Sequence, residues 1–133
     1  MPPEGFEPIV SENPFGKAVG PIYEKRDGET KGDQWVRGFL VEEKHTNRVG
    51  VAHGGVLMTF ADIVLATAVL AATKTPIATI QLNTQFISPA RLGAWIEGRA
   101  VVTRHTKALA FVKGEITSSG KPVADVSGIF KIL

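Results

Sequence analysis

The longest hydrophobic stretch of the chain runs from Val56 to Thr73 and contains a single charged residue, Asp62. Its other positions hold Val, Leu, Met, Phe, Ile, Ala or Thr, so the stretch has no continuous polar face. A helix that is apolar on nearly all sides is typical of a buried position. The proline at position 76 ends the helix, because proline cannot continue one. The pattern therefore predicts one long helix that is buried on most sides.

Shorter segments on both sides of this helix alternate apolar and polar residues, which is typical of strands. Residues 79–87 alternate most clearly, with Ile80, Leu82 and Phe86 predicted on one face and Thr79 on the other. Strands are predicted at residues 20–26, 35–41, 79–87, 94–103, 109–118 and 123–132. The first two form a hairpin, and the last four follow the helix as an antiparallel meander. Interior glycines at positions 98, 114 and 128 indicate bulges or close approaches. A curved antiparallel sheet wrapped around one helix is an α+β fold.

The length of 133 residues predicts a single domain. We expect residues 1–19 to form an irregular arm, with prolines at positions 2, 3, 8 and 14, and residues 20–133 to form the domain. The chain has no cysteine, which excludes disulfides and thiol chemistry. A formal charge of +2 without a long Lys/Arg run does not indicate a nucleic-acid-binding protein.

The beginning of the chain lacks the apolar core of a signal peptide. The Val56–Thr73 stretch is about long enough for a membrane span, but the charge of Asp62 in its interior argues against one. We therefore expect a cytoplasmic protein that does not bind membranes.

Two features of the predicted helix point to chemistry. Gly54-Gly55 falls where the helix should begin, and the first N–H groups of a helix have no internal acceptor. With no side chain on Gly54, a ligand oxygen can approach such an N–H, as in an oxyanion hole. Asp62 is the second feature, because a buried carboxylate needs partners and is a candidate for catalysis when no structural partner is evident.

The two features cannot serve one substrate within one chain. Asp62 lies eight positions after Gly54, which corresponds to roughly 12 Å along a helix axis. A second copy of the helix, related by a two-fold axis, would place Gly54 of one subunit opposite Asp62 of the other. The hypothesis is an obligate homodimer with two composite sites.

Three segments carry a resemblance to a known family: residues 41–55, which read VEEKHTNRVGVAHGG and precede Asp62, then Ser88–Gly93 and Lys107–Phe111. Over residues 20–133 the chain resembles the hotdog-fold acyl-CoA thioesterases, of the phenylacetic-acid-degradation and thioesterase-superfamily-member-2 types. The resemblance implies a hotdog fold, dimers that usually pair into a homotetramer, and a hydrolase that acts on an acyl-CoA thioester. It implies no metal and no bound cofactor, coenzyme A being part of the substrate.

The resemblance also implies roles for individual residues. Asp62 acts as general base or nucleophile, Gly54 gives its N–H to the thioester carbonyl, and Asn47 helps to hold the water or the thioester. Thr79 assists with its hydroxyl from the facing subunit, at a position where many relatives have serine. Purely structural roles are the alternatives: Asp62 could cap a neighbouring loop, and Asn47 could merely close a turn. His53 either hydrogen-bonds the loop or contacts the thioester.

Substrate contacts are predicted at the start of the helix and on turns. Gly55 and Met58 are expected to contact the substrate, with Phe60 also lining the acyl pocket. Positive charge at the pocket mouth would suit the phosphates of coenzyme A, although a solvated basic rim is the alternative. The candidate cationic residues are Arg91, Arg104, His105 and Lys107. The acyl group itself is not indicated by the sequence.

Two rival functions stay open at this point. A hotdog dehydratase or hydratase would need a His–acid pair for proton transfer at carbon, which His53 and Asp62 could supply. A non-enzymatic acyl-CoA-binding protein is the other rival, but it would be expected to lack the acid or to carry a further segment for its output. The spacing of the motif fits the thioesterase better than either.

Overall fold

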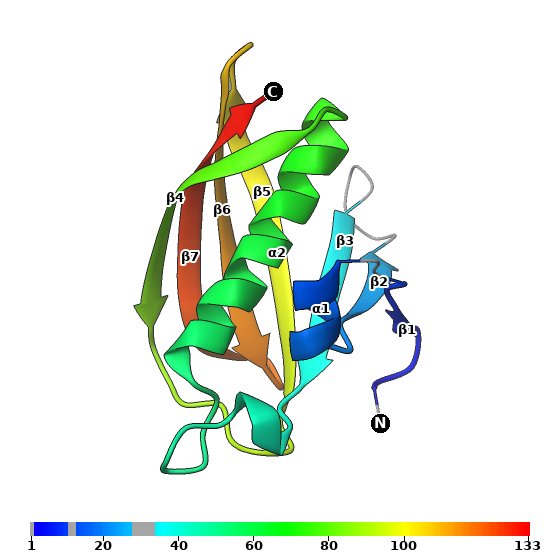
Figure 1. The fold of residues 1–133 in the computed structure, drawn as a ribbon, viewed down its shortest axis with the longest axis vertical. Helices are drawn as coiled ribbons and strands as arrows, with labels where there is room; N and C mark the ends of the chain where they lie inside the picture. Colours follow the sequence, from blue (N-terminus) through cyan, green and yellow to red (C-terminus); the bar gives the residue numbers. More distant parts are fainter. Residues whose placement is uncertain (1, 11–12, 28–33) are drawn as a thin grey trace.

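The computed structural model describes residues 2–10, 13–27 and 34–133. The long helix α2 (Gly54–Thr73) lies against one face of a curved seven-stranded antiparallel sheet, as Figure 1 shows. This arrangement confirms the predicted α+β hotdog fold. The helix begins at Gly54 and ends at Thr73, as predicted.

The remaining elements are short by comparison, apart from the last four strands. They are β1 (Glu7–Pro8), α1 (Pro14–Val19), β2 (Tyr23–Asp27), β3 (Gln34–Leu40), the 3-10 helix η1 (Glu43–His45), β4 (Ile77–Phe86), β5 (Trp95–His105), β6 (Leu109–Ser118) and β7 (Lys121–Ile132). The strands are arranged in the order β1-β2-β3-β5-β6-β7-β4. The hairpin of β2 and β3 and the meander of β5, β6 and β7 are confirmed. The predicted place of β4 in that meander is wrong, because β4 pairs with β7 at the edge of the sheet.

The core lies between α2 and the sheet. Phe60 of α2 is only 1% exposed and packs against Phe39 of β3, with ring centroids 4.8 Å apart. Gly98 of β5 lies directly under the helix, since a Cβ built there would sit 2.5 Å from Cγ2 of Val64. The prediction of a close approach at this glycine is therefore confirmed. Phe60 is buried in the core, and its place in the acyl pocket stays a prediction.

The opposite side of α2 is open within a single chain. Six of its twenty residues are buried, namely Leu57, Phe60, Ala61, Val64, Leu65 and Val69. Met58 and Leu70 are 36% and 46% exposed, and Asp62 is half-buried. The prediction of a helix buried on most sides is therefore wrong for one chain. By length and composition alone α2 could cross a membrane, a test that the core helices of other folds also pass.

The first residues pack onto the sheet and are more regular than predicted. Asn13 caps α1 by accepting the N–H of Phe15 at 3.0 Å, and Pro14 occupies the first helical position, where it needs no acceptor. Phe6 meets the ring of Trp95 edge-on with centroids 5.0 Å apart, and the Ile9 N–H donates to the Ile22 carbonyl at 2.8 Å. The expectation of an irregular arm is wrong for β1 and α1.

Candidate active site

The start of α2 is held by His53, the residue before the first helical turn. Its Nδ1 accepts the N–H of Gly55 at 2.8 Å, so His53 acts as the N-cap of the helix. The sequence predicts two roles for His53, a hydrogen bond to the loop or a contact with the thioester. In the structure His53 makes a local hydrogen bond. The bond also occupies the Gly55 N–H, whereas the N–H of Gly54 has no acceptor among the residues that the structure describes.

Gly54 is a glycine that its own fold does not require. A Cβ built on Gly54 would meet Cζ of Phe86 at 3.4 Å, which is an ordinary contact. On Gly55, by contrast, a Cβ would lie 3.0 Å from Nδ1 of the capping His53. Beside Gly54 lies a shallow groove of about 330 Å³, lined by Ala52, Leu57 and residues 86–89. Gly54 therefore lies in the wall of this groove, with an N–H that has no acceptor in the described part of the chain.

Asn47 closes the loop that leads to this helix. Its Oδ1 accepts the N–H groups of Val49 at 3.0 Å and Val51 at 3.3 Å, and Gly50 turns the chain with a φ of 83°. The turn-closing interpretation is therefore confirmed for the side-chain oxygen. The NH₂ group of Asn47 makes no hydrogen bond to the described parts of the chain, so it remains available to a ligand.

Asp62 has one hydrogen-bond partner that the structure records, Thr79 of β4. The Thr79 hydroxyl donates to Oδ1 of Asp62 at 2.7 Å. Both residues belong to the same chain, so wherever Asp62 acts, Thr79 accompanies it. Asp62 is therefore not a loop cap but a carboxylate on the open side of α2, oriented by a strand hydroxyl.

A β-bulge places Thr79 on the helix side of the sheet. The pairing of β4 with β7 shifts between Thr79 and Gln81, so Ile80 is the extra residue of the strand. Thr79 reaches α2 and Leu82 packs against the core, although strict alternation would put residues three apart on opposite faces. The prediction that Thr79 faces away from Leu82 is wrong for this reason, and Ile80 is left 55% exposed.

The predicted cationic residues do not form one cluster within the chain. The backbone of Arg91 forms an isolated β-bridge with Val51, which lies just before the start of α2. Arg104 and His105 are the last residues of β5 rather than a connection, and Lys107 follows in the turn to β6. Figure 1 shows this β5–β6 turn at the opposite end of the molecule, on the side where α2 ends. All four side chains are exposed.

His45 belongs to the segment that carries the family resemblance, but the sequence did not indicate its role. It is 3% exposed; its Nδ1 accepts the N–H of Glu42 at 2.9 Å and its Nε2 bonds the carbonyl of Val19. Its own carbonyl accepts the N–H of His53 at 2.8 Å. His45 thus links the end of α1 to η1 and to His53, the N-cap of α2. No pattern in the sequence distinguishes this buried histidine from one on the surface.

The site residues consequently form two groups on one chain. Asp62 and Thr79 form the first, on the open side of α2, while Asn47, His53 and Gly54 form the second at its start. The separation of roughly 12 Å along the helix keeps the groups from acting on the same carbonyl. Within the described ranges, no group of three or more His, Asp or Glu side chains could hold a metal ion.

Comparison with known proteins identifies relatives over most of the chain. The sequence profile of the thioesterase superfamily matches residues 49–124. A Pseudomonas aeruginosa protein provisionally named an esterase is 33% identical over 132 residues, covering 98% of this chain and 96% of its own. Human acyl-coenzyme A thioesterase 13 is 37% identical over 87 residues, which are 63% of this chain and 62% of the human one. The crystal structure of zebrafish thioesterase superfamily member 2 superposes with a TM-score of 0.80 at 25% identity, covering 92% of this chain and 89% of the other.

Proposed function

Because the chain belongs to the thioesterase superfamily, we propose that it hydrolyses acyl-coenzyme A thioesters to a free acid and coenzyme A. The name of the human relative supports coenzyme A as the thiol, although the alignment spans less than two thirds of that protein. The observation that carries the proposal is the Thr79–Asp62 hydrogen bond of 2.7 Å. It gives the apolar helix one oriented carboxylate on its open side, where a substrate can reach it.

In the proposed reaction, the N–H of Gly54 donates to the thioester carbonyl oxygen at the positive end of α2. Asp62 takes a proton from a water molecule whose oxygen attacks the carbonyl carbon. The carbon–sulfur bond then breaks, and the proton passes to the departing thiolate, so that acid and thiol leave. Direct attack by Asp62 would instead form a mixed anhydride that water hydrolyses, and both routes use the same residues. The NH₂ group of Asn47 is placed to hold the water or the carbonyl.

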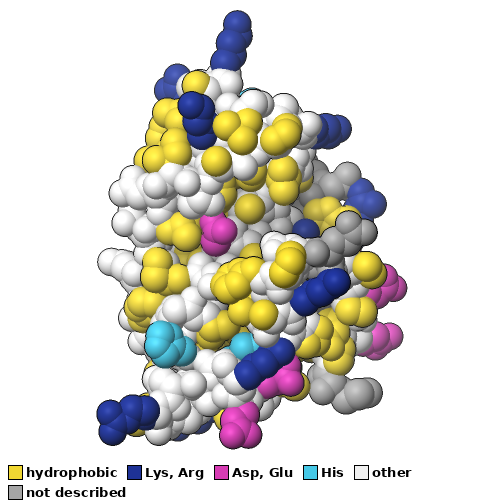
Figure 2. All heavy atoms as spheres, in the orientation of Figure 1, with side chains coloured by type: hydrophobic (Ala, Val, Ile, Leu, Met, Phe, Trp, Pro, Cys, Tyr) yellow, Lys and Arg dark blue, Asp and Glu magenta, His cyan; other side chains and the backbone are white. Residues whose placement is uncertain are grey.

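A second copy of the chain completes the site in this proposal. The separation of Gly54 from Asp62 requires it, and two surface features support it. β4 is an edge strand with one unpaired side, and Ile80 beside Thr79 and Met58 and Leu70 of α2 are exposed apolar side chains. Figure 2 shows hydrophobic side chains over much of the face on which α2 lies, with Lys and Arg side chains mostly along its rim. A homodimer with antiparallel α2 helices would cover this surface; pairing into a tetramer follows from the resemblance alone.

An antiparallel dimer would also bring the separated cationic residues of the two subunits to one coenzyme A molecule. The β5–β6 turn, with Arg104, His105 and Lys107, lies near the end of α2 in its own chain. In a dimer with Gly54 opposite Asp62, that end would extend beyond the start of the partner helix, on the side where the partner's approach loop and Arg91 lie. Cations from both subunits could then meet the phosphates of one coenzyme A. The dehydratase alternative receives no such support, because Nδ1 of His53 is already engaged with Gly55.

The direct test is release of coenzyme A thiol from a panel of acyl-CoAs that includes short, medium and aryl acyl groups. We expect steady hydrolysis of at least one member without added metal or cofactor. Hydration of an enoyl-CoA without thiol release would instead establish the dehydratase class. Binding of acyl-CoA without turnover of any panel member would establish a non-enzymatic protein.

The composite site is tested by mixing two inactive variants, Asp62→Asn and Gly54→Val. In a two-fold symmetric dimer, each mixed pair carries both substitutions in one site and neither in the other. After random exchange of equal amounts, about a quarter of all sites in the mixture should therefore be intact. Native mass spectrometry of the mixture verifies that subunits have exchanged. If mixed dimers are present and no activity returns, Asp62 and Gly54 do not act across the interface.

A further inference from the structure

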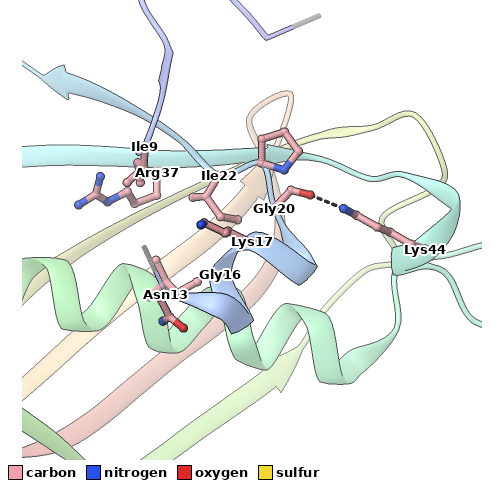
Figure 3. A pocket seen from close by; sticks show the side chains of 10 residues that line it. Ile9, Asn13, Gly16, Lys17, Gly20, Ile22, Arg37 and Lys44 are labelled. Atoms are coloured by element: carbon pink, nitrogen blue, oxygen red, sulfur yellow. Dashed lines mark hydrogen bonds between the residues drawn. The ribbon is translucent and has the colours of Figure 1, made fainter. Parts of the chain in front are cut away.

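A cavity of about 580 Å³ lies on the flank of α2 that faces α1, a size typical of small-molecule sites. Its walls come from the N-terminal segment, α1, residues 20–22 between α1 and β2, Arg37 of β3, Lys44 of η1 and Ile63 of α2. Figure 3 shows Lys17 between Arg37 and Lys44, which lie at opposite ends of the lining. The sequence analysis did not indicate this site. Arg37 shares a strand face with Trp35 and Phe39, and an arginine on such an inward face can indicate a binding site.

The lining carries a surplus of positive charge. Three of the ten described residues that line the cavity are cationic, and none of the ten is Asp or Glu. Arg37 is fixed from outside the cavity, because its Nε donates to Oγ1 of Thr67 at 3.0 Å and its guanidinium pairs with Glu24. Lys44 donates only to the uncharged carbonyl of Gly20, and Lys17 has no ion pair within the described part of the chain.

Apart from Asn13 and two glycines, the rest of the lining is apolar. Ile9, Pro21, Ile22 and Ile63 supply most of the surface between the cations. An inorganic anion would leave these side chains without a partner, and a neutral hydrocarbon would leave Lys17 and Lys44 without one. The lining as a whole fits a ligand with an apolar body and an anionic end.

The cavity shares the helix α2 with Asp62, the proposed catalytic carboxylate. Ile63, one of its wall residues, directly follows Asp62 on α2. Successive side chains on a helix point about 100° apart, so the cavity lies beside Asp62 and not on top of it. For the acyl group to reach the cavity, it must extend from Asp62 around the helix to the flank that carries Ile63.

We propose that this cavity holds the acyl group and selects acyl groups whose far end carries a carboxylate, that is, CoA thioesters of dicarboxylic acids. This inference rests on the proposed thioesterase function. Lys17 is the specificity-determining residue, because its side chain is exposed and has no ion pair within the described part of the chain, while Arg37 is a fixed donor at one end of the cavity. Lys44 contributes charge from the position where it ties η1 to Gly20.

The test compares two substrates of equal chain length, adipyl-CoA and hexanoyl-CoA. The wild-type enzyme should prefer adipyl-CoA in kcat/KM, and Lys17→Ala should reduce that preference about tenfold, as expected for loss of one partly exposed charge-assisted contact. Lys17→Arg should retain the preference and Lys17→Glu should invert it. Lys131→Ala, which removes an exposed lysine of β7 away from the cavity, is the matched control and should change nothing.

The possible failures are distinguishable. If both substrates are hydrolysed and Lys17→Ala leaves their ratio unchanged, the specificity inference is overturned while the thioesterase function stands. If no acyl-CoA releases thiol, the proposed function fails, and the cavity is judged by binding instead. In that case hexanoate, but not the uncharged 1-hexanol, should raise the melting temperature of the wild type and not that of Lys17→Ala; equal shifts with the two compounds would overturn the carboxylate site.

Discussion

Both sides of α2 carry mostly apolar side chains, but their environments are different. On the side that faces the sheet, Phe60 and Val64 are buried against β3 and β5, so closely that Gly98 has no room for a side chain. On the open side, Met58 and Leu70 are partly exposed around Asp62. Only the first side is explained by the fold of one chain.

The difference shows where to look for chemistry. A fold tends to satisfy its polar groups internally, so a helix face that keeps apolar side chains in the open together with an oriented carboxylate serves something outside the chain. Gly54 follows the same logic, since its own fold would accept a Cβ there. The sheet-facing side supplies stability, and the open side supplies the proposed reaction and the proposed dimer contact.

The largest effect is expected on the open side, from Asp62→Asn. Asparagine keeps the size of the side chain and can still accept the Thr79 hydroxyl, but it is neither a base nor a nucleophile. We expect kcat for the best acyl-CoA to fall by about 10²–10⁴, the usual contribution of a positioned general base. The melting temperature and the oligomeric state should change little. Full activity of Asp62→Asn would show that another group is the base.

This division explains how much of the fold the sequence could predict. Hydrophobic periodicity records which positions are apolar, so it found α2, the hairpin and the limits of β6 correctly. It cannot record which apolar positions face the same chain, so it predicted a helix buried on most sides. Strand order at the sheet edge was also missed, because periodicity describes faces and not neighbours, and β4 pairs with the last strand of the chain.

The second prediction contrasts the two sides through stability. Phe60→Ala should lower the free energy of unfolding by about 3–5 kcal/mol, because it leaves a cavity under the helix. Leu70→Ala, the matched substitution on the open side, should cost under about 1 kcal/mol if the chain is monomeric, as for a typical surface position. Urea unfolding at several protein concentrations measures both.

The dependence on protein concentration of the stability lost by Leu70→Ala distinguishes a monomer from a dimer. A second copy that covers the open side would raise its cost towards the roughly 2–5 kcal/mol of a buried leucine, at concentrations where the assembly persists. A small, concentration-independent loss for Leu70→Ala, together with a monomeric mass in solution, would contradict the proposed dimer. Where Phe60→Ala does not fold, Phe60→Leu provides the smaller loss in the same position.

The candidate site was predictable to the extent that it consists of residue types at fixed spacing. Gly54 and Asp62 could be selected from the helix pattern, whereas Thr79 depended on the family resemblance because a bulge reverses its predicted face. Lys17, Arg37 and Lys44 come from three distant segments, so no local pattern brings them together. The cytoplasmic location and the absence of a cofactor stay predictions.

The smallest effect is expected at Thr79, the strand residue that orients Asp62. Thr79→Val keeps the shape of the side chain and removes the hydroxyl that donates to Asp62 at 2.7 Å. A hydrogen bond to a charged group contributes about 1.5–3 kcal/mol when buried, and this one is exposed in a single chain, so we expect kcat to fall about tenfold with KM nearly unchanged. Thr79→Ser restores the hydroxyl without the methyl group and should remain within about threefold of the wild type by the same argument. A purely structural role for Thr79 would show as a lower melting temperature in both variants, whereas a positioning role separates them in kcat alone. Equal activity of Thr79→Val and the wild type would leave Asp62 oriented by its helix alone, and the open side would then need no help from the sheet.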